Sequence, residues 1–238
     1  DREITDYMQG KIDAVLAKVE GGEPVQYAVG KALFMGNNYE VTPAVLIPRP
    51  ETAGLVDLIS AEYAGRSDLR VLDAGTGSGC IAISLARALP FSRVTGIDIS
   101  ADAITVARRN AEALKTAVDF RTEDILKAKP EEAAFDIIVS NPPYICRSEA
   151  AEMDKRVLDF EPDGALFVPD NDPLLFYKAI AAYASKALKP RGTLWFEINS
   201  RFPDEMRRLL EDCGFADIDI SRDYRGLYRY AKASRPDA

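Results

Sequence analysis

The stretch LRVLDAGTGSGCIAISLARAL, residues 69–89, combines an apolar run, a glycine loop and a second apolar segment. The run at 69–75 predicts a buried strand, and the spacing of the apolar residues at 79–89 predicts a helix. The glycines between them let the backbone turn and come close to a ligand at the carboxyl end of the strand. This unit is typical of an α/β sheet.

Downstream of this unit, segments with strand and helix patterns alternate. Such alternation predicts a doubly wound, mostly parallel sheet, here with seven strands. The last two strands have no helix between them, so we expect an antiparallel hairpin at the sheet edge. Predicted strands are 69–75, 93–100, 117–125, 135–140, 192–199, 217–223 and 227–234; predicted helices are 79–89, 101–115, a segment within 172–188, and 203–214.

Upstream of the unit, residues 1–20 have the apolar spacing of one amphipathic helix, and the glycines and proline of EGGEP (20–24) end it. Residues 32–52 predict two short strands joined by a GNN turn, followed by a loop with several prolines. We therefore expect residues 1–50 to form an appendage on the main domain.

The composition of the 238 residues excludes several classes of protein. No apolar run approaches the ~20 residues of a membrane span. There are no histidines, which excludes a Ser-His-Asp or Cys-His mechanism in its standard form. The net charge of -8 argues against a uniformly basic nucleic-acid-binding face. Three scattered cysteines, Cys80, Cys146 and Cys213, indicate reduced thiols in a cytoplasmic protein.

The glycine loop differs from a dinucleotide-binding loop in two ways. Its pattern is G-x-G-x-G, and Cys80 occupies the place of the third glycine of G-x-G-x-x-G. Asp73 precedes the loop, where a carboxylate suits a cationic or amine-bearing ligand better than a pyrophosphate. These differences favour another ligand class.

Three successive predicted strands carry an aspartate near the carboxyl end: Asp73, Asp98 and Asp124. In a doubly wound sheet these ends converge on one crevice. Asp98 follows Gly75 by about 23 residues, where an acceptor for ribose hydroxyls is found in nucleotide-binding sheets. The alternative is that each aspartate forms a turn or caps a helix.

The D-x-G-x-G-x-G loop with Asp98 and Asp124 resembles the S-adenosylmethionine site of class I methyltransferases. The resemblance covers the chain from about residue 69 to the end. It implies that the loop packs against the methionine part, the second acidic residue holds the ribose, and the third region meets the adenine. Where family members often have an aromatic residue beside the adenine, this chain has Ile125. The implied cofactor-binding residues are Asp73, Gly75, Thr76, Gly77, Ser78, Gly79, Asp98, Ile99, Asp124, Ile125 and Asn141.

The segment Asn141-Pro142-Pro143-Tyr144 follows the predicted strand 135–140. An amide or aromatic amine is a poor nucleophile, because its lone pair is delocalised. The Asn141 oxygen and the Pro142 carbonyl can accept its two N–H groups and aim the lone pair at a methyl group. Tyr144 offers a flat face to the planar group. The segment therefore predicts a binding site for a planar –NH2 group; the alternative is a simple turn.

This motif alone leaves the target open between adenine or cytosine in nucleic acid and glutamine in a protein. The segment before the domain is similar to that of the peptide chain release factor glutamine methyltransferases. The similarity rests on GEP (22–24), VLIPRPET (45–52), FEPDGAL (160–166) and SRDYRG (221–226), besides NPPY. It implies that Asn141, Pro142 and Tyr144 are catalytic, and that the substrate-binding residues are Asn141, Pro142, Pro143, Tyr144, Leu46 and Arg49.

The resemblance also implies a division into three parts. Residues 1–30 correspond to the end of a helical substrate-docking domain, which is expected to be truncated. Residues 31–52 form a β-hairpin and a proline-rich linker, and residues 53–238 form the methyltransferase domain. The chain departs from the family at Ala53, where a second acidic residue is usual, and at QYAVG (26–30).

The implied reaction is N5-methylation of the glutamine in the Gly-Gly-Gln loop of a release factor, with S-adenosylhomocysteine as product and no metal. The alternatives are an adenine-N6 methyltransferase on DNA or RNA, a glutamine methyltransferase on a ribosomal protein, and a non-catalytic module that binds S-adenosylmethionine. The sister family that acts on a ribosomal-protein glutamine tends to carry Pro-Arg-Ser where this chain has Pro-Arg-Pro (48–50), so the resemblance favours the release factor. We expect a cytoplasmic monomer that binds neither membrane nor nucleic acid directly.

Overall fold

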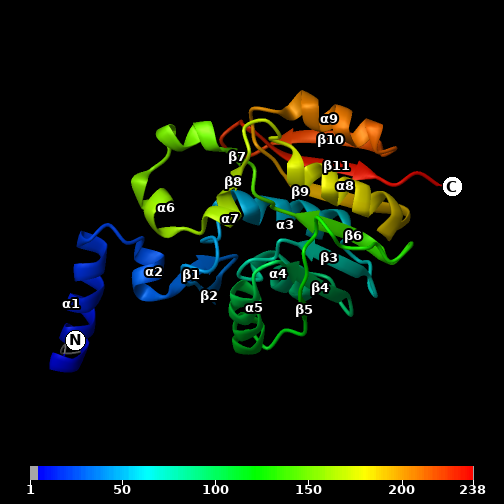
Figure 1. The fold of residues 1–238 in the computed structure, drawn as a ribbon. Coiled ribbons are helices and arrows are strands. Elements are labelled where there is room, and N and C mark those ends of the chain that lie inside the picture. Colours follow the sequence, from blue (N-terminus) through cyan, green and yellow to red (C-terminus); the bar gives the residue numbers. More distant parts are fainter. Residues whose placement is uncertain (1–4, 238) are drawn as a thin grey trace.

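The computed structural model, which describes residues 5–237, has a seven-stranded sheet at its centre (Figure 1). The strand order is β10-β11-β9-β6-β3-β4-β5. β3, β4, β5, β6 and β9 run parallel, whereas β11 is antiparallel to both β9 and β10. The predicted fold class is thus confirmed. The strands are β3 (Arg70–Ala74), β4 (Arg93–Asp98), β5 (Asp119–Thr122), β6 (Phe135–Ser140), β9 (Leu188–Glu197), β10 (Ala216–Arg222) and β11 (Tyr228–Ser234).

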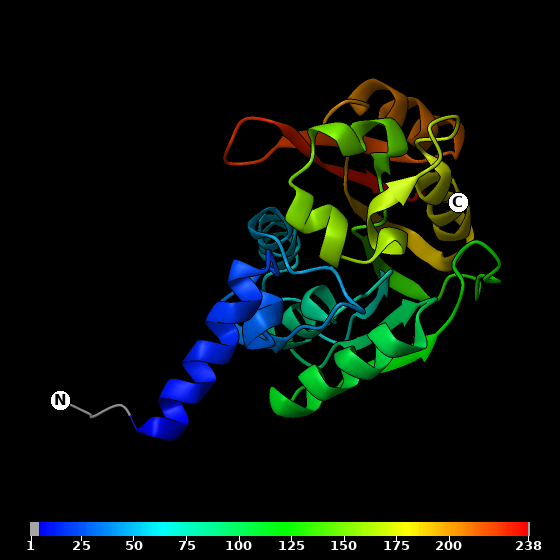
Figure 2. The ribbon, with the colours of Figure 1, turned by 60° about the vertical axis from the view of Figure 1, so that its left-hand side comes forward.

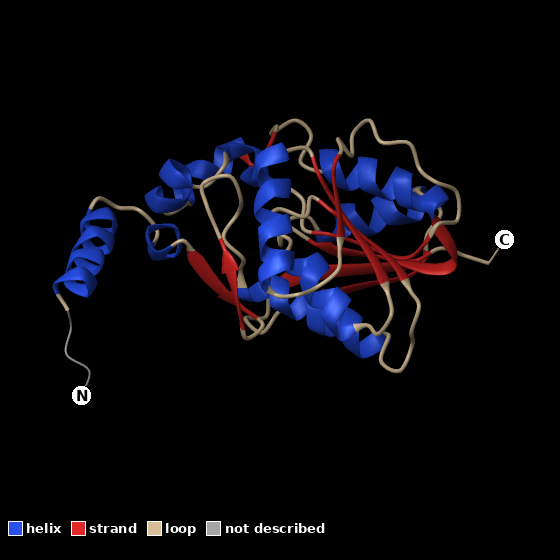
Figure 3. Ribbon diagram, turned by 90° about the horizontal axis from the view of Figure 1, so that it is seen from below, coloured by secondary structure: helices blue, strands red, loops and turns tan. Residues whose placement is uncertain are grey.

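Helices cover both faces of this sheet (Figure 3). Neighbouring residues of a strand point to opposite faces, so Val71 packs in the core on one side and Leu72 in the core on the other. Each face therefore buries its own apolar layer. The first layer includes side chains of α3 (Pro50–Glu62), α4 (Cys80–Ala88) and α5 (Ala101–Ala113), and the second those of α8 (Leu175–Ala187) and α9 (Pro203–Asp212).

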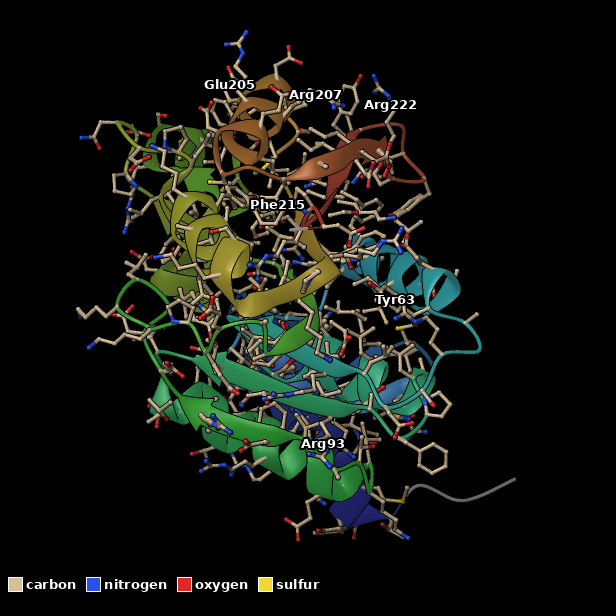
Figure 4. The ribbon with its side chains drawn as sticks, turned by 90° about the vertical axis from the view of Figure 1, so that its right-hand side faces the viewer. Tyr63, Arg93, Glu205, Arg207, Phe215 and Arg222 are labelled. Carbon is tan, nitrogen blue, oxygen red and sulfur yellow. The ribbon has the colours of Figure 1, made fainter. Side chains whose placement is uncertain are left out.

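The helix α9 shows how amphipathic spacing places a helix on the sheet. Met206 and Leu210, four residues apart, are buried against the second layer. Glu205 and Arg207 are exposed, and Figure 4 shows them at the outer surface of the molecule. Phe215, just after the helix, closes the core beneath it.

The N-terminal region contains the helices α1 (Asp6–Glu20) and α2 (Val25–Val29) and the hairpin β1 (Lys31–Phe34) and β2 (Asn37–Glu40). α1 has no buried residue and extends away from the main body (Figure 2). Residues 1–4 of the predicted N-terminal helix lie outside the described residues. No helix within 5–237 is both long and apolar enough to cross a membrane.

The hairpin is fastened to the sheet domain by polar contacts. The Asn110 side chain of α5 accepts from Glu40 N at 2.6 Å and donates to Glu40 O at 3.0 Å. Tyr39 is fully buried, and its hydroxyl lies 3.0 Å from Ser84 Oγ on α4. The hairpin is thus continuous with the first apolar layer, to which it contributes Phe34 and Tyr39.

Tyr39→Phe tests this attachment. It removes a buried hydrogen bond and keeps the ring, so the free energy of unfolding should fall by about 0.5–1.5 kcal/mol. Tyr7→Phe on exposed α1 is the matched control and should change it by less than about 0.5 kcal/mol. Urea unfolding measures both; equal midpoints for the two variants would contradict the attachment.

Three regions differ from the sequence predictions. Helix α2 lies in a stretch for which no element was predicted. Helix α3 was not predicted, because the prolines of VLIPRPET indicated a loop; Pro50 instead occupies the first position of the helix, where the missing N–H has no cost. Residues 145–168 form short elements without a readable periodicity. These are β7 (Ile145–Cys146), the 3-10 helix η1 (Arg147–Glu152), α6 (Lys155–Phe160), α7 (Asp163–Leu166) and β8 (Phe167–Val168).

Among the strands, β5 and β9 differ most from their predicted ranges. β5 ends at Thr122, so Asp124 lies in the following turn and not at the strand end. β9 begins at Leu188, four residues before the predicted start, and its register against β6 is irregular between Phe135 and Ile137. Pro190 within its first half interrupts the strand pattern of the sequence.

Candidate active site

The candidate site lies at the carboxyl ends of β3, β4 and β6. β4 and β5 lie on one side of β3, and β6 lies on the other. The order in which successive strands are added to the sheet therefore reverses between β3 and β6. Such a switch point leaves a crevice at the strand ends. A cavity of 390 Å³ occupies it, lined by residues that follow β3, β4, β5 and β6.

The glycine loop forms one wall of this cavity. Gly75, Gly77 and Gly79 have φ values of 76°, 54° and 79°, which favour glycine. A Cβ on Gly75 or Gly77 would meet nothing within 4 Å, whereas one on Gly79 would lie 3.0 Å from Phe120. The first two glycines therefore leave room for a ligand, and the third permits close packing of α4 on the sheet.

Asp73 lies beneath the loop and not in the cavity wall. Its side chain is fully buried and accepts hydrogen bonds from Thr76 Oγ1 at 2.6 Å and Ala82 N at 3.2 Å. Burial raises the pKa of Asp73 to about 7, although the Thr76 hydrogen bond acts against this. The carboxylate thus shapes the loop, and its contact with a cofactor stays a prediction. Thr76 and Ser78 line the cavity.

Asp98 lies in the cavity wall at the end of β4. Its Oδ2 accepts from Gly77 N and its Oδ1 from Ser100 N, both at 2.9 Å. Burial raises the pKa of Asp98, while these backbone hydrogen bonds lower it. Each carboxylate oxygen can accept two hydrogen bonds. The side chain therefore fixes the glycine loop and keeps acceptor capacity for a ligand hydroxyl.

Apolar side chains form the far part of the same wall. Ile99 lines the cavity although its side chain is 67% exposed, and Ile125 lines it while packing against the second core layer. Asp124 also lines the cavity, but its carboxylate accepts from Leu126 N at 3.0 Å and pairs with Lys127 at 2.8 Å. Ile99 and Ile125 thus give this part of the cavity wall apolar surface, which suits a flat ring.

The Asn-Pro-Pro-Tyr segment lies where two cavities meet. A second cavity of 240 Å³ adjoins the first, and Asn141 and Pro142 line both. Pro143 lines the larger cavity and Tyr144 the smaller one. The motif therefore separates a space of cofactor size from one that suits a side chain.

Next to this motif is a buried polar network that the sequence analysis missed; Thr52 of this network also lines the larger cavity and Glu197 the smaller one. Asn141 Nδ2 donates to Thr52 Oγ1 at 3.2 Å, and Thr52 Oγ1 donates to Glu197 Oε2 at 2.7 Å. The Tyr144 hydroxyl donates to Glu197 Oε1 at 3.0 Å and accepts from Arg229 Nη1 at 3.3 Å. The signal in the sequence was Glu197, a carboxylate at the end of the apolar strand run LWFE (194–197).

The network holds an ionisable group in an environment that disfavours charge. Burial raises the pKa of Glu197, and the hydrogen bonds from Thr52 and Tyr144 act against the rise. Burial also raises the pKa of Tyr144, so its hydroxyl keeps its proton near neutral pH. The phenol is therefore a donor to the carboxylate.

Leu46 and Arg49 line both cavities. Arg49 Nη2 is already paired with Glu161 Oε1 at 2.5 Å, and Glu161 Oε2 accepts from Ile47 N at 3.3 Å. Glu161 is buried, whereas the Arg49 side chain is one-third exposed. This pair joins the VLIPRPET segment to the residues after α6.

Arg49→Ala should lower the free energy of unfolding by at least about 1 kcal/mol, because it leaves a buried carboxylate without its charged donor. The control is Arg156→Ala, which breaks an exposed pair with Asp154 and should cost about 0–1 kcal/mol. Chemical denaturation compares the two. If Arg49→Ala is no more destabilising than the control, the pair does not join these segments.

The residues of the larger cavity fit S-adenosylmethionine. The open faces of Gly75 and Gly77 leave space for the methionine part, Asp98 offers acceptors for ribose hydroxyls, and Ile99 and Ile125 suit adenine. Among residues 5–237 no cluster of three or more candidate metal ligands is found.

Comparisons with known proteins agree with this geometry. Residues 66–225 match a family model described as a methyltransferase domain. The release factor glutamine methyltransferase of Bacteroides thetaiotaomicron is 46% identical over 95% of this chain and 81% of its own length; that of Koribacter versatilis is 38% identical over 99% and 83%. A methyltransferase structure from Pyrococcus furiosus, 17% identical, aligns with a TM-score of 0.61 over 98% of this chain and 100% of its own, which shows the shared fold. The chain therefore belongs to the family of release factor glutamine methyltransferases.

Proposed function

We propose that this protein transfers a methyl group from S-adenosylmethionine to the side-chain amide nitrogen of the glutamine in the Gly-Gly-Gln loop of a peptide chain release factor. S-adenosylhomocysteine is the second product. The observation that carries the proposal is that Asn141 and Pro142 line both the 390 Å³ and the 240 Å³ cavity. A methyl donor and an amide acceptor then meet at this motif.

The main contribution of the protein to this reaction is to orient the glutamine amide toward the methyl group. When bound, S-adenosylmethionine supplies an electrophilic methyl group on a sulfonium. The Asn141 side-chain oxygen and the Pro142 carbonyl accept the two N–H groups of the glutamine amide and turn its lone pair toward the larger cavity. Because these acceptors are preorganised, they need no rearrangement during transfer. The proton leaves after the new bond forms, which agrees with a chain without histidine.

The smaller cavity is the proposed glutamine pocket. Tyr144 lines it, with its hydroxyl held by Glu197, so the ring has a fixed orientation. Leu46 from the VLIPRPET segment lines it as well, and Arg49 closes its edge while paired with Glu161. In this proposal Leu46 and Tyr144 enclose the substrate side chain, and Arg49 holds the wall in place. Pro143 lines the larger cavity, on the cofactor side of the motif.

Labelled S-adenosylmethionine tests the reaction and its rivals together. The protein is incubated with release factor, with release factor in which the Gly-Gly-Gln glutamine is replaced by alanine, with ribosomal protein and with DNA. We expect label in the first alone, with one methyl group on that glutamine by mass spectrometry. Label in DNA or ribosomal protein, or in the alanine-substituted release factor, would contradict the proposal.

We further infer a cytoplasmic monomer whose protein substrate is the release factor and which makes no direct contact with nucleic acid. The net charge of -8 and three free cysteines, two of them buried, support this inference. Light scattering of the protein alone and with release factor measures its mass and that of the complex.

We also propose a division of labour along the chain. Residues 1–30 dock the substrate, residues 31–52 connect this region to the methyltransferase domain, and residues 53–238 catalyse the transfer.

A further inference from the structure

We propose that Thr52 and Glu197 are positioning residues that decide which end of the Asn141 side chain faces the reacting amide. This inference rests on the proposed function. Thr52 lies in the first turn of α3 and Glu197 is the last residue of β9, so 145 positions separate them in sequence. Both are buried, at 3% and 1% exposure.

The direction of each hydrogen bond follows from which groups can donate. The hydrogen bonds from Thr52 and Tyr144 and the charge of the Arg229 guanidinium favour the ionised form of Glu197 against the effect of burial. As a carboxylate, Glu197 only accepts. The hydroxyl proton of Thr52 therefore points to Glu197 Oε2, at 2.7 Å. Thr52 has no second proton, so toward Asn141 it only accepts, and the atom of Asn141 at 3.2 Å is the amide nitrogen.

This order of protons resolves an ambiguity that an asparagine otherwise has, because its oxygen and nitrogen are nearly equal in shape. With Nδ2 held by Thr52, the Oδ1 of Asn141 is directed away from Thr52. Asn141 lines both cavities, so this oxygen is the acceptor available where they meet. An acceptor is what an N–H of the substrate amide needs, and a donor there would repel it.

The second oxygen of Glu197 is fixed by the same logic. A guanidinium only donates, so the Tyr144 hydroxyl accepts from Arg229 at 3.3 Å and gives its own proton to Glu197 Oε1 at 3.0 Å. Arg229 is held in turn by Asp223 at 3.3 Å, whose side chain is fully buried. One carboxylate therefore orients two residues of the Asn-Pro-Pro-Tyr motif.

The burial of Glu197 supports a functional role. Burying a carboxylate is costly, and a well-packed apolar side chain of similar size is often as stable or more so. The ordering of protons is a task that an apolar side chain cannot perform. Thr52 and Glu197 thus supply the preorganisation that the Asn141 acceptor requires.

Thr52→Val is the first test, with Thr52→Ser as its matched control. Valine keeps the shape and removes the hydroxyl; serine keeps the hydroxyl. We expect Thr52→Val to lower kcat for release factor about tenfold, the equivalent of one lost hydrogen bond. The KM for release factor and the Kd for S-adenosylmethionine should change less than about twofold, because valine keeps the shape of Thr52 where it lines the larger cavity. Thr52→Ser should restore most of the rate.

Glu197→Gln is the sharper test. Because Arg229 forces the Tyr144 hydroxyl to donate, the oxygen of the introduced amide faces Tyr144 and its –NH2 faces Thr52. Thr52 then accepts from that –NH2 and donates to Asn141, which turns its oxygen inward and its –NH2 toward the substrate. We expect kcat to fall about 10–100-fold. In the double variant Thr52→Val/Glu197→Gln, the loss should be clearly smaller than the product of the two single losses, because both act through one chain.

The outcomes separate the two proposals. A wild-type protein that methylates no release factor would overturn the proposed function and this inference with it. An active wild type with equally active, folded Thr52→Val and Glu197→Gln variants would overturn the inference alone. Equal losses in Thr52→Val and Thr52→Ser, or independent losses that multiply in the double variant, would also overturn it. Circular dichroism and thermal midpoints confirm that each variant is folded.

Discussion

Asn141→Ala is expected to slow methyl transfer in a single turnover by about 10²–10³-fold while the fold survives. Removing one preorganised hydrogen-bonding group from a reacting centre has an effect of this size. The affinity for S-adenosylmethionine should change far less, because the glycine loop and Asp98 remain. Rapid-quench methylation of release factor measures the rate, with circular dichroism as the folding control.

Asn141→Asp separates shape from hydrogen bonding. It keeps an acceptor but removes the amide that donates to Thr52 Oγ1 at 3.2 Å. It also adds negative charge close to a sulfonium, which favours ground-state binding of the cofactor without helping turnover. We therefore expect cofactor binding to persist and the rate to fall. A folded Asn141→Ala with a near-normal single-turnover rate would mean that the residue merely shapes the turn.

Asp98→Ala is expected to weaken binding of S-adenosylmethionine by about 1–3 kcal/mol, which is roughly 5–150-fold in Kd. The substitution removes the acceptor proposed for the ribose hydroxyls and frees Gly77 N, which Asp98 holds at 2.9 Å. Both effects act on the same ligand. Titration calorimetry with S-adenosylmethionine and with S-adenosylhomocysteine measures the loss.

The control for this experiment is Asp102→Ala, an exposed carboxylate in the first turn of α5, four residues from Asp98. It changes the net charge equally and touches neither the loop nor the cavity, so the Kd should stay within about twofold of wild type. An unchanged Kd in Asp98→Ala would show that the ribose lies elsewhere.

The sheet and the larger cavity were predictable because their signals are local in sequence. The glycine loop directly follows β3, Asp98 is the last residue of β4, and parallel strands align at their carboxyl ends. Asn141 was predictable for the same reason, because it directly follows the last residue of β6. A side chain at such a place needs no long-range information to be recognised.

The network behind Asn141 could not be predicted in this way. Thr52, Glu197 and Arg229 belong to elements distant in sequence, and their contacts depend on how α3 packs against β9 and β11. The prolines before Thr52 indicated a loop, which concealed the helix that carries it. The segment 145–168, which supplies much of the smaller cavity, consists of pieces too short to show a period.

The central claim, that Asn141 and Pro142 grip the glutamine amide between the two cavities, is tested most directly by a crystal structure with S-adenosylhomocysteine and a Gly-Gly-Gln peptide. The account predicts that the glutamine side chain occupies the smaller cavity. Its amide nitrogen should lie at hydrogen-bond distance, about 2.7–3.2 Å, from both Asn141 Oδ1 and the Pro142 carbonyl oxygen. A glutamine bound away from these two oxygens, or an Asn141 that presents its –NH2 to the substrate, would contradict it.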